Sequence, residues 1–232
     1  MTLFYCPDIA KMHILSEEES QHAVKVLRLQ AGEEIIVVDG TGGFYNARIT
    51  NPHHKRCEFE ITGTIAEYGK KKYRLHIAIA PTKNMDRLEW FVEKTTEIGI
   101  DEITPVICRF SERKQVKGDR LEKIIVSAAK QSVKAYFPKL NSQCNFSEFI
   151  EKYAASQKLI AHCYEGEKPL LKNAAKVNEE IIILIGPEGD FSREEVELAT
   201  LNGYVAISLG ESRLRTETAG VAACHTVALI NQ

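Results

Sequence analysis

Two short apolar runs in the C-terminal part of the chain each end at a glycine-containing loop. Residues 181–185 and 204–209 are largely apolar and rich in β-branched side chains, which is typical of buried strands in a parallel sheet. Between them, Ser192 and Glu195 have the spacing of a capping box, which predicts that a helix begins at about Ser192. The pattern therefore predicts a β-loop-α-β unit with a ligand site beyond the carboxyl ends of its strands.

From residue 73 onward, strand-like and helix-like stretches alternate, which is typical of an α/β domain. Within residues 85–98 apolar side chains recur at helical spacing, and Gly99 follows as a C-terminal stop. In the predicted helix 119–136, one apolar face that includes Val133 is expected to point inward. The other predicted elements are strands at 73–80, 103–108 and 159–164 and helices at 146–155 and 217–230.

Residues 1–70 show a different pattern, in which short strands surround one helix. Ser16 and Glu19 form a second capping-box pattern that opens a helix through about Leu27. Asp39-Gly40 between two β-rich runs predicts a hairpin. We therefore expect a small β-barrel domain at 1–70, a charged linker at 67–72 and a second domain at 73–232.

Composition narrows the classes of function. The formal net charge is −2, so any affinity for nucleic acid must come from local basic patches. Six cysteines without a CxxC pair argue against structural zinc and a redox dithiol, so no metal site is expected. No signal peptide and no apolar run long enough for a membrane span is visible, so a cytoplasmic location is expected.

The two glycine-containing loops do not follow the common nucleotide-binding patterns. No Gly-Lys-Ser/Thr follows the glycines of Gly186-Pro187-Glu188-Gly189, and the three spaced glycines of a dinucleotide fingerprint are absent. Taken alone, these loops could be ordinary strand-to-helix turns. Their position at two strand ends, together with the polar cluster Glu211–Thr218, favours a binding site.

The segments LIGPEGDFS (184–192) and SLGESRLRTETA (208–219) closely resemble the signature of SPOUT-class methyltransferases. Within that class they resemble the bacterial family that methylates N3 of a uridine in small-subunit (16S) ribosomal RNA. Residues 22–49 resemble the PUA-like RNA-binding domain of that family. The resemblance implies a trefoil-knotted α/β domain, S-adenosylmethionine as methyl donor, and a homodimer with the site at its interface. It also implies that the substrate is the ribosomal RNA of the 30S subunit.

The resemblance also suggests roles for individual residues. Arg215 is expected to stabilise the developing uridine anion, and Glu217 or Glu188 to accept the N3 proton or to orient Arg215. An Arg–Glu ion pair that only closes the loop is the alternative. The residues expected to bind the cofactor are Gly186, Pro187, Gly189, Leu209, Gly210, Leu214, Thr216 and Thr218.

Several cations are candidates for contacts with RNA phosphates, although a solvated charged surface would show the same pattern. Lys130, Val133 and Lys134 depart from the family pattern, so contacts there are less defined. The candidates are His22, Lys25, Arg28, Lys83, Arg87, Arg109, Arg113, Lys130 and Lys134.

Two other functions remain open from the sequence. The same fold could serve a non-catalytic RNA-binding factor in ribosome assembly, although the complete Arg215–Thr218 segment argues against this. A methyltransferase of the same class could instead modify a ribose 2′-hydroxyl, because both reactions use the same donor pocket.

Overall fold

The structure is a computed structural model that describes residues 2–232, and the chain divides into two compact units. One unit consists of the residues up to Lys70 together with 126–137, and the other of 71–125 together with 138–232. The sequence analysis assigned 126–137 to the second domain. In the structure Ala135 and Phe137 of this segment pack against Leu3 and Val38 of the first unit.

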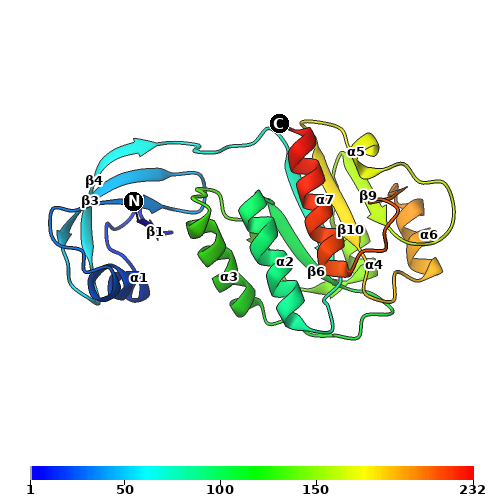
Figure 1. The fold of residues 1–232 in the computed structure, drawn as a ribbon, viewed down its shortest axis with the longest axis horizontal. Coiled ribbons are helices and arrows are strands. Elements are labelled where there is room, and N and C mark those ends of the chain that lie inside the picture. Colours follow the sequence, from blue (N-terminus) through cyan, green and yellow to red (C-terminus); the bar gives the residue numbers. More distant parts are fainter. Residues whose placement is uncertain (1) are drawn as a thin grey trace. The chain divides into compact units, whose positions relative to one another are not determined.

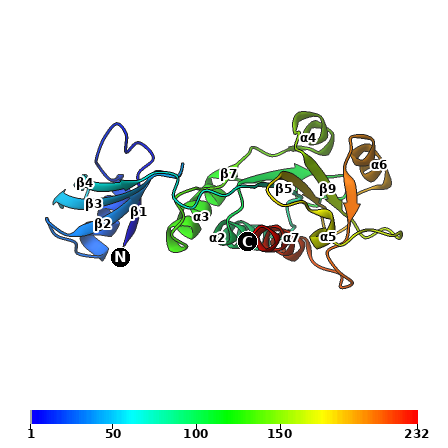
Figure 2. The ribbon, with the colours of Figure 1, turned by 90° about the horizontal axis from the view of Figure 1, so that it is seen from above.

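The first unit is built on a four-stranded sheet in the order β1-β2-β3-β4 (Figures 1 and 2). Its first strand pairs with the second in parallel, and the remaining neighbours are antiparallel. The predicted helix begins at the Ser16 cap as α1 (Glu17–Gln21) and continues as a π-helical turn, η1 (His22–Val26). The strands are β1 (Leu3–Tyr5), β2 (Glu34–Val38), β3 (Phe44–Asn51) and β4 (Glu58–Ile65).

The second unit contains a parallel sheet in the order β11-β9-β10-β5-β6-β7, and β8 also pairs with β6. This confirms the predicted α/β class with a parallel sheet. The two C-terminal runs, β10 (Glu180–Ile185) and β11 (Val205–Ile207), are not neighbours, because each pairs with β9 (Gln157–Ala161). The other strands are β5 (Arg74–Ile79), β6 (Glu102–Ile107), β7 (Lys139–Leu140) and β8 (Cys144–Asn145).

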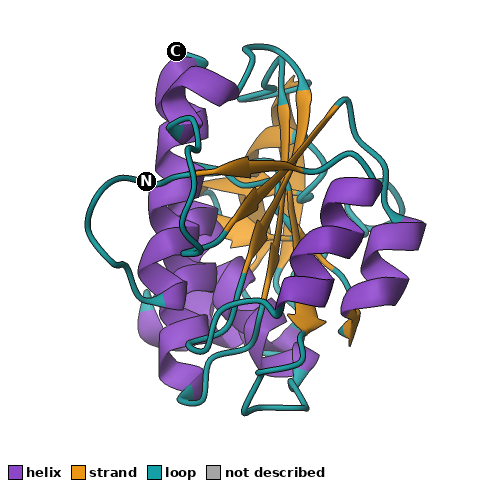
Figure 3. Ribbon diagram, turned by 90° about the vertical axis from the view of Figure 1, so that its right-hand side faces the viewer, coloured by secondary structure: helices purple, strands orange, loops and turns teal. Residues whose placement is uncertain are grey.

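Helices cover both faces of this sheet (Figures 2 and 3). One face carries α2 (Met85–Ile98), α5 (Leu171–Ala174) and α7 (Thr216–Ile230), and the other carries α4 (Phe146–Lys152) and α6 (Arg193–Leu201). The predicted local signals are present, since Gly99 ends α2 at a φ of 110° and the Ser192–Glu195 capping box opens α6. Apolar side chains of both helical layers therefore bury the strands.

The helix α3 (Gly118–Gln131) is shorter than predicted. The prediction that it extends to 136 with Val133 facing inward was wrong. Val133 has a φ of 55° and is exposed rather than buried. A β-branched residue in the left-handed region cannot continue a helix, so the chain turns after Gln131.

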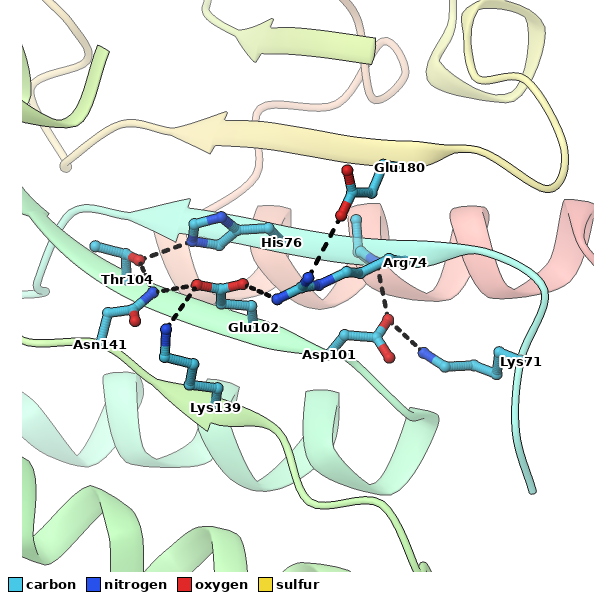
Figure 4. Close-up of polar contacts among 10 residues, drawn as sticks. Lys71, Arg74, His76, Asp101, Glu102, Thr104, Lys139, Asn141 and Glu180 are labelled. Carbon is cyan, nitrogen blue, oxygen red and sulfur yellow. Dashed lines mark hydrogen bonds and ion pairs between the residues drawn. The ribbon is translucent and has the colours of Figure 1, made fainter. Parts of the chain in front are cut away.

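A network of charged side chains lies at the amino ends of the strands of the second unit (Figure 4). Arg74 Nη2 lies 2.5 Å from Glu102 Oε2, and Asn141 Nδ2 donates to Glu102 Oε1 at 2.6 Å. Burial lowers the pKa of His76 to about 4, and its Nε2 is 2.7 Å from Thr104 Oγ1. Because these groups satisfy one another, the network stabilises the amino edge of the sheet.

Candidate active site

The candidate site lies at the opposite, carboxyl edge of the same sheet. The loops 162–168, 186–191 and 208–215 follow β9, β10 and β11, which are adjacent in the sheet. They enclose two adjoining cavities of about 280 and 470 Å³. Both cavities are lined by Ala161, Cys163, Arg213, Leu214 and Ala219. Together they offer the volume and the mixed apolar and polar lining of a small-molecule site.

The loop after β10 packs against a buried aromatic ring and is hydrogen-bonded to the start of α7. A Cβ atom at Gly186 would lie 3.1 Å from the ring of the buried Phe191, so the glycine lets the loop close over that ring. Thr216, the first residue of α7, donates from Oγ1 to the Gly186 carbonyl at 3.0 Å. The start of α7 and the loop after β10 therefore form one wall of the site.

Most of the predicted cofactor residues meet in this place. Gly186, Pro187, Leu214 and Thr216 line the smaller cavity, and Leu209, Gly210 and Leu214 line the larger one. Gly189 and Thr218 are not among the described residues that line the two cavities.

The sequence analysis missed the loop after β9. Ala161, His162, Cys163 and Lys168 of this strand and loop line the larger cavity. Burial, followed by the charge of Lys168, lowers the pKa of His162, so its imidazole favours the neutral form. The strand itself was predicted, and the rule that ligands bind beyond the carboxyl ends of parallel strands would have found the loop.

The three candidate catalytic residues have different surroundings. Arg215 and Glu188 both line the smaller cavity, and Glu188 Oε1 accepts from the Lys83 backbone N–H at 3.1 Å. Glu217 is buried on the first turn of α7, where its Oε1 lies 3.7 Å from Arg87 Nε. Its Oε2 has no hydrogen-bond partner among residues 2–232.

These contacts bear on the alternative of an Arg–Glu pair that only closes the loop. Across the described part of the chain, Arg215 takes part in no ion pair or hydrogen bond that would occupy its guanidinium. The carboxylate of Glu217 is paired with Arg87 of α2 instead. The guanidinium of Arg215 is therefore available at the cavity.

Of the predicted RNA-binding cations of the second unit, Arg87 lies on α2, and the other three lie in loops at the carboxyl edge, where they have protein partners. Arg113 Nη2 donates to the Lys83 carbonyl at 2.7 Å, and Lys83 Nζ lies 2.8 Å from Glu112 Oε2. Arg109 Nη1 lies 3.3 Å from Glu194 Oε2. These residues shape the loops as well as carrying charge.

The cations of the first unit lie at the end of its helix and on the segment 126–137. His22 and Lys25 belong to η1, and Arg28 follows it with a left-handed φ of 58°. Lys130 Nζ lies 2.5 and 2.8 Å from the two carboxylate oxygens of Glu19, and its side chain is only 19% exposed. Lys130 therefore forms an internal ion pair with Glu19. Lys134 lies beyond the end of α3, because the predicted helix 119–136 stops at Gln131, so the two lysines do not share a helical face.

Among residues 2–232, no group of three or more histidine, cysteine or acidic side chains has the arrangement of a metal site. In the same range no helix is long and apolar enough to cross a membrane.

Comparison with known proteins identifies the family to which the chain belongs. Residues 69–228 match the family model of an RNA methyltransferase domain, and residues 15–62 match that of an RNA methyltransferase PUA domain. The chain is 31% identical to the ribosomal RNA small subunit methyltransferase E of Mesomycoplasma hyopneumoniae, over 85% of this chain and 86% of that protein.

Solved structures agree along the whole chain. The crystal structure of a probable rRNA-methyltransferase from Porphyromonas gingivalis is 41% identical, with a TM-score of 0.94, and covers 100% of this chain and 98% of that one. A ribosomal RNA small subunit methyltransferase E from Neisseria gonorrhoeae, bound to S-adenosyl methionine, is 28% identical with a TM-score of 0.83 and covers 100% and 98%.

Proposed function

Because the chain belongs to the ribosomal RNA small subunit methyltransferase E family, a family of RNA methyltransferases with a PUA domain, we propose that it methylates N3 of a uridine in small-subunit ribosomal RNA. S-adenosylmethionine supplies the methyl group. The observation that carries the proposal is the pair of adjoining cavities at the carboxyl edge, lined by Gly186, Leu209, Leu214 and Arg215. Because this substrate is part of the ribosome, we also propose a cytoplasmic location.

The residues around the cavities fit this cofactor in size and chemistry. A Cβ at Gly210 would meet no atom within 4 Å, so the backbone there is open to a ligand. Apolar side chains such as Leu209 and Leu214 can cover a planar base, while backbone groups of the loops can hold its polar atoms. We assign Gly186, Pro187, Leu209, Gly210, Leu214 and Thr216 to cofactor binding. Gly189 in the loop after β10 and Thr218 in the first turn of α7 are assigned supporting roles.

The reaction needs a group that removes the weakly acidic N3 proton and a group that stabilises the resulting anion. We assign the second role to Arg215, whose guanidinium is uncommitted at the cavity. We assign the first role to Glu188, because it lines the same cavity, whereas Glu217 is buried and paired with Arg87. In this arrangement Glu217 orients the start of α7, and through it Arg215.

Cations of both units are proposed to bind RNA phosphates. In the first unit these are His22, Lys25, Arg28 and Lys134, and in the second Lys83, Arg87, Arg109 and Arg113. Since the net charge is −2, such local cations must supply the electrostatic part of the affinity. A substrate that presents several phosphate segments at once, as the assembled 30S subunit does, suits cations distributed in this way.

We further propose that the protein is a homodimer and that its second unit contains a trefoil knot. Trp90 on α2 and Leu229 on α7 are 41% and 57% exposed although the two helices pack together, and a second subunit could cover them. The bond between Thr216 and Gly186 brings the chain after β11 back against the loop after β10, which is compatible with a knotted crossing. Analytical ultracentrifugation would measure the dimer directly.

The test is methyl transfer from labelled S-adenosylmethionine to small ribosomal subunits that lack the modification, with naked ribosomal RNA alongside and the product nucleoside identified by mass spectrometry. We expect 3-methyluridine and a preference for subunits. A 2′-O-methyl product would overturn the assignment of N3 as the methylated atom. Cofactor binding without transfer to either substrate would mean that the substrate is a different one, and the absence of both transfer and cofactor binding would favour the non-catalytic factor.

Two matched variants test the catalytic roles. Glu188→Gln keeps the acceptor for the Lys83 N–H but removes the base, so we expect a rate loss of about 10²-fold or more, with partial recovery at high pH where the uridine ionises by itself. Arg215→Ala should lower the rate by a similar factor and leave cofactor affinity nearly unchanged. If Arg215→Ala abolished cofactor binding, its role would be to hold the cofactor.

A further inference from the structure

Asp190, the last residue of the turn after β10, has an unusual backbone conformation. Its φ is 67°, in the left-handed region that glycine adopts freely and that aspartate and asparagine tolerate better than other residues. The turn is closed by the Asp190 N–H, which donates to the Pro187 carbonyl at 2.9 Å. Since glycine would satisfy this φ at lower cost, the side chain of Asp190 requires its own explanation.

The carboxylate of Asp190 joins two of the loops that form the candidate site. Its Oδ1 accepts from the Phe191 N–H at 2.8 Å, inside its own loop. Its Oδ2 accepts from the Cys163 N–H at 2.7 Å, in the loop after β9. Asp190 and Cys163 both line the smaller cavity, and Cys163 also lines the larger one. One side chain therefore fixes the distance between two walls of the site.

A second bond between the same loops depends on the same turn. Tyr164 Oη donates to the Phe191 carbonyl at 2.7 Å, next to the bond between Asp190 and Cys163. Within residues 2–232, the other hydrogen bonds of the β9 loop are internal, such as the one that Lys168 Nζ donates to the His162 carbonyl at 2.8 Å. The Tyr164 ring also lies beside the guanidinium of Arg193, which opens α6 directly after the same turn. The turn at 190–191 is therefore the point at which the β9 loop is attached to its neighbour.

We propose that Asp190 is a positioning residue for cofactor binding, which holds the loop after β9 in its binding-competent place before the ligand arrives. The inference rests on the proposed function, because it concerns the same cofactor site. Backbone N–H groups bonded to a carboxylate form strong, charge-assisted hydrogen bonds. A loop that is ordered beforehand does not lose that conformational entropy on binding, so the affinity rises.

The test compares Asp190→Gly with Asn178→Gly. Asn178 is the matched control, because it is also a non-glycine residue in the left-handed region, with a φ of 59°, and lies on a loop away from the cavities. Both changes relieve the same backbone strain, but only the first removes a link between the loops. We expect the Kd for S-adenosylmethionine, measured by calorimetry, to rise about tenfold in Asp190→Gly, which equals about 1.4 kcal/mol. It should stay unchanged in Asn178→Gly.

The conservative variant Asp190→Asn separates the effect of the two hydrogen bonds from the effect of the left-handed backbone conformation. Asparagine also tolerates the left-handed region, but it has one acceptor oxygen where aspartate has two, so it can keep only one of the two N–H bonds. Its Kd should lie between those of the wild type and Asp190→Gly. If Asp190 only stabilised its own turn, its replacement would lower the melting temperature of the free protein and leave the Kd unchanged. That result would overturn the proposal.

Cys163 provides a readout that does not depend on activity. It is the exposed cysteine of the chain, whereas the others are buried or half-buried. We expect a maleimide to alkylate Cys163 faster in Asp190→Gly than in the wild type and in Asn178→Gly, and S-adenosylmethionine to protect the wild type. Equal alkylation rates in all three proteins would also overturn the proposal. If the wild type failed to bind S-adenosylmethionine, the proposed function would fail, while the alkylation rates would still test the link.

Discussion

The close packing of α7 on α2 makes a specific prediction for Gly220. A Cβ at this position would lie 2.5 Å from Phe91 Cε2 and 3.1 Å from Ile79 Cδ1. Carbon atoms normally approach to about 3.5–4.0 Å, and both neighbours are fully buried, so either the Phe91 ring or the whole helix must move. Gly220→Ala therefore overpacks the interface between α7, α2 and β5.

Two opposing effects determine how much Gly220→Ala changes the free energy of unfolding. Overpacking a tight core costs about 1–3 kcal/mol, while alanine is favoured over glycine inside a helix by about 1 kcal/mol. Because a 2.5 Å contact is severe, we expect overpacking to dominate, with a net loss of about 1–2 kcal/mol in the free energy of unfolding. Gly118→Ala is the control, since a Cβ there, at the start of α3, meets no atom within 4 Å. It should be neutral or slightly stabilising.

The assay is urea unfolding followed by fluorescence of Trp90, the single tryptophan, which lies on α2 beside Phe91. The urea midpoint of Gly220→Ala should fall at an unchanged m-value. Cofactor affinity should weaken as well, because α7 begins at Thr216 in the wall of the site. A midpoint equal to or above that of the wild type would refute the packing argument.

Two further predictions concern buried charges. Burial holds the pKa of His76 at about 4, below its ordinary 6.5. The unfolded chain therefore binds this proton at a higher pH than the folded chain does. As the pH falls from 6.5 towards 4, up to about 3 kcal/mol of the free energy of unfolding is lost. His76→Gln, which can still bond to Thr104 but does not titrate, should lose less stability between pH 7 and 4.5 in urea unfolding; equal losses would exclude His76 as the cause. Lys130→Met leaves the carboxylate of Glu19 unpaired in a mostly buried place and should cost about 3 kcal/mol, and adding Glu19→Gln should restore most of it. A Lys130→Met protein as stable as the wild type would show that the pair contributes nothing.

The parts of the fold that depend on short sequence spacing were predicted well. The apolar spacing in 85–98 and Gly99 gave the bounds of α2, and the Ser192–Glu195 pair gave the start of α6. The helix α3 was predicted too long, because periodicity continued past Gln131 while Val133 turns into the left-handed region. Apolar periodicity reports the possible buried face of a segment, but it does not report where the backbone leaves the helix.

The candidate site shows the same division. The two loops after β10 and β11 were visible in the sequence as glycines and polar residues at the ends of apolar runs. The loop after β9, with Cys163 and His162, lacks such a composition, and only its place between the other two in the sheet brings it into the site. The assignment of Glu188 and Glu217 to different surroundings likewise needed the positions of Lys83 and Arg87.

The sequence by itself determined the class of the fold, most strands and helices, and the family, because these depend on residues within a few positions of one another. The short strands β7 and β8 were not predicted. The tertiary structure decided which distant side chains meet. It placed β9 between β10 and β11, joined Asp190 to Cys163, and paired Lys130 with Glu19. Local spacing fixes backbone hydrogen bonds and buried faces, but many long-range pairings are compatible with it, and only the packing of the whole unit selects among them.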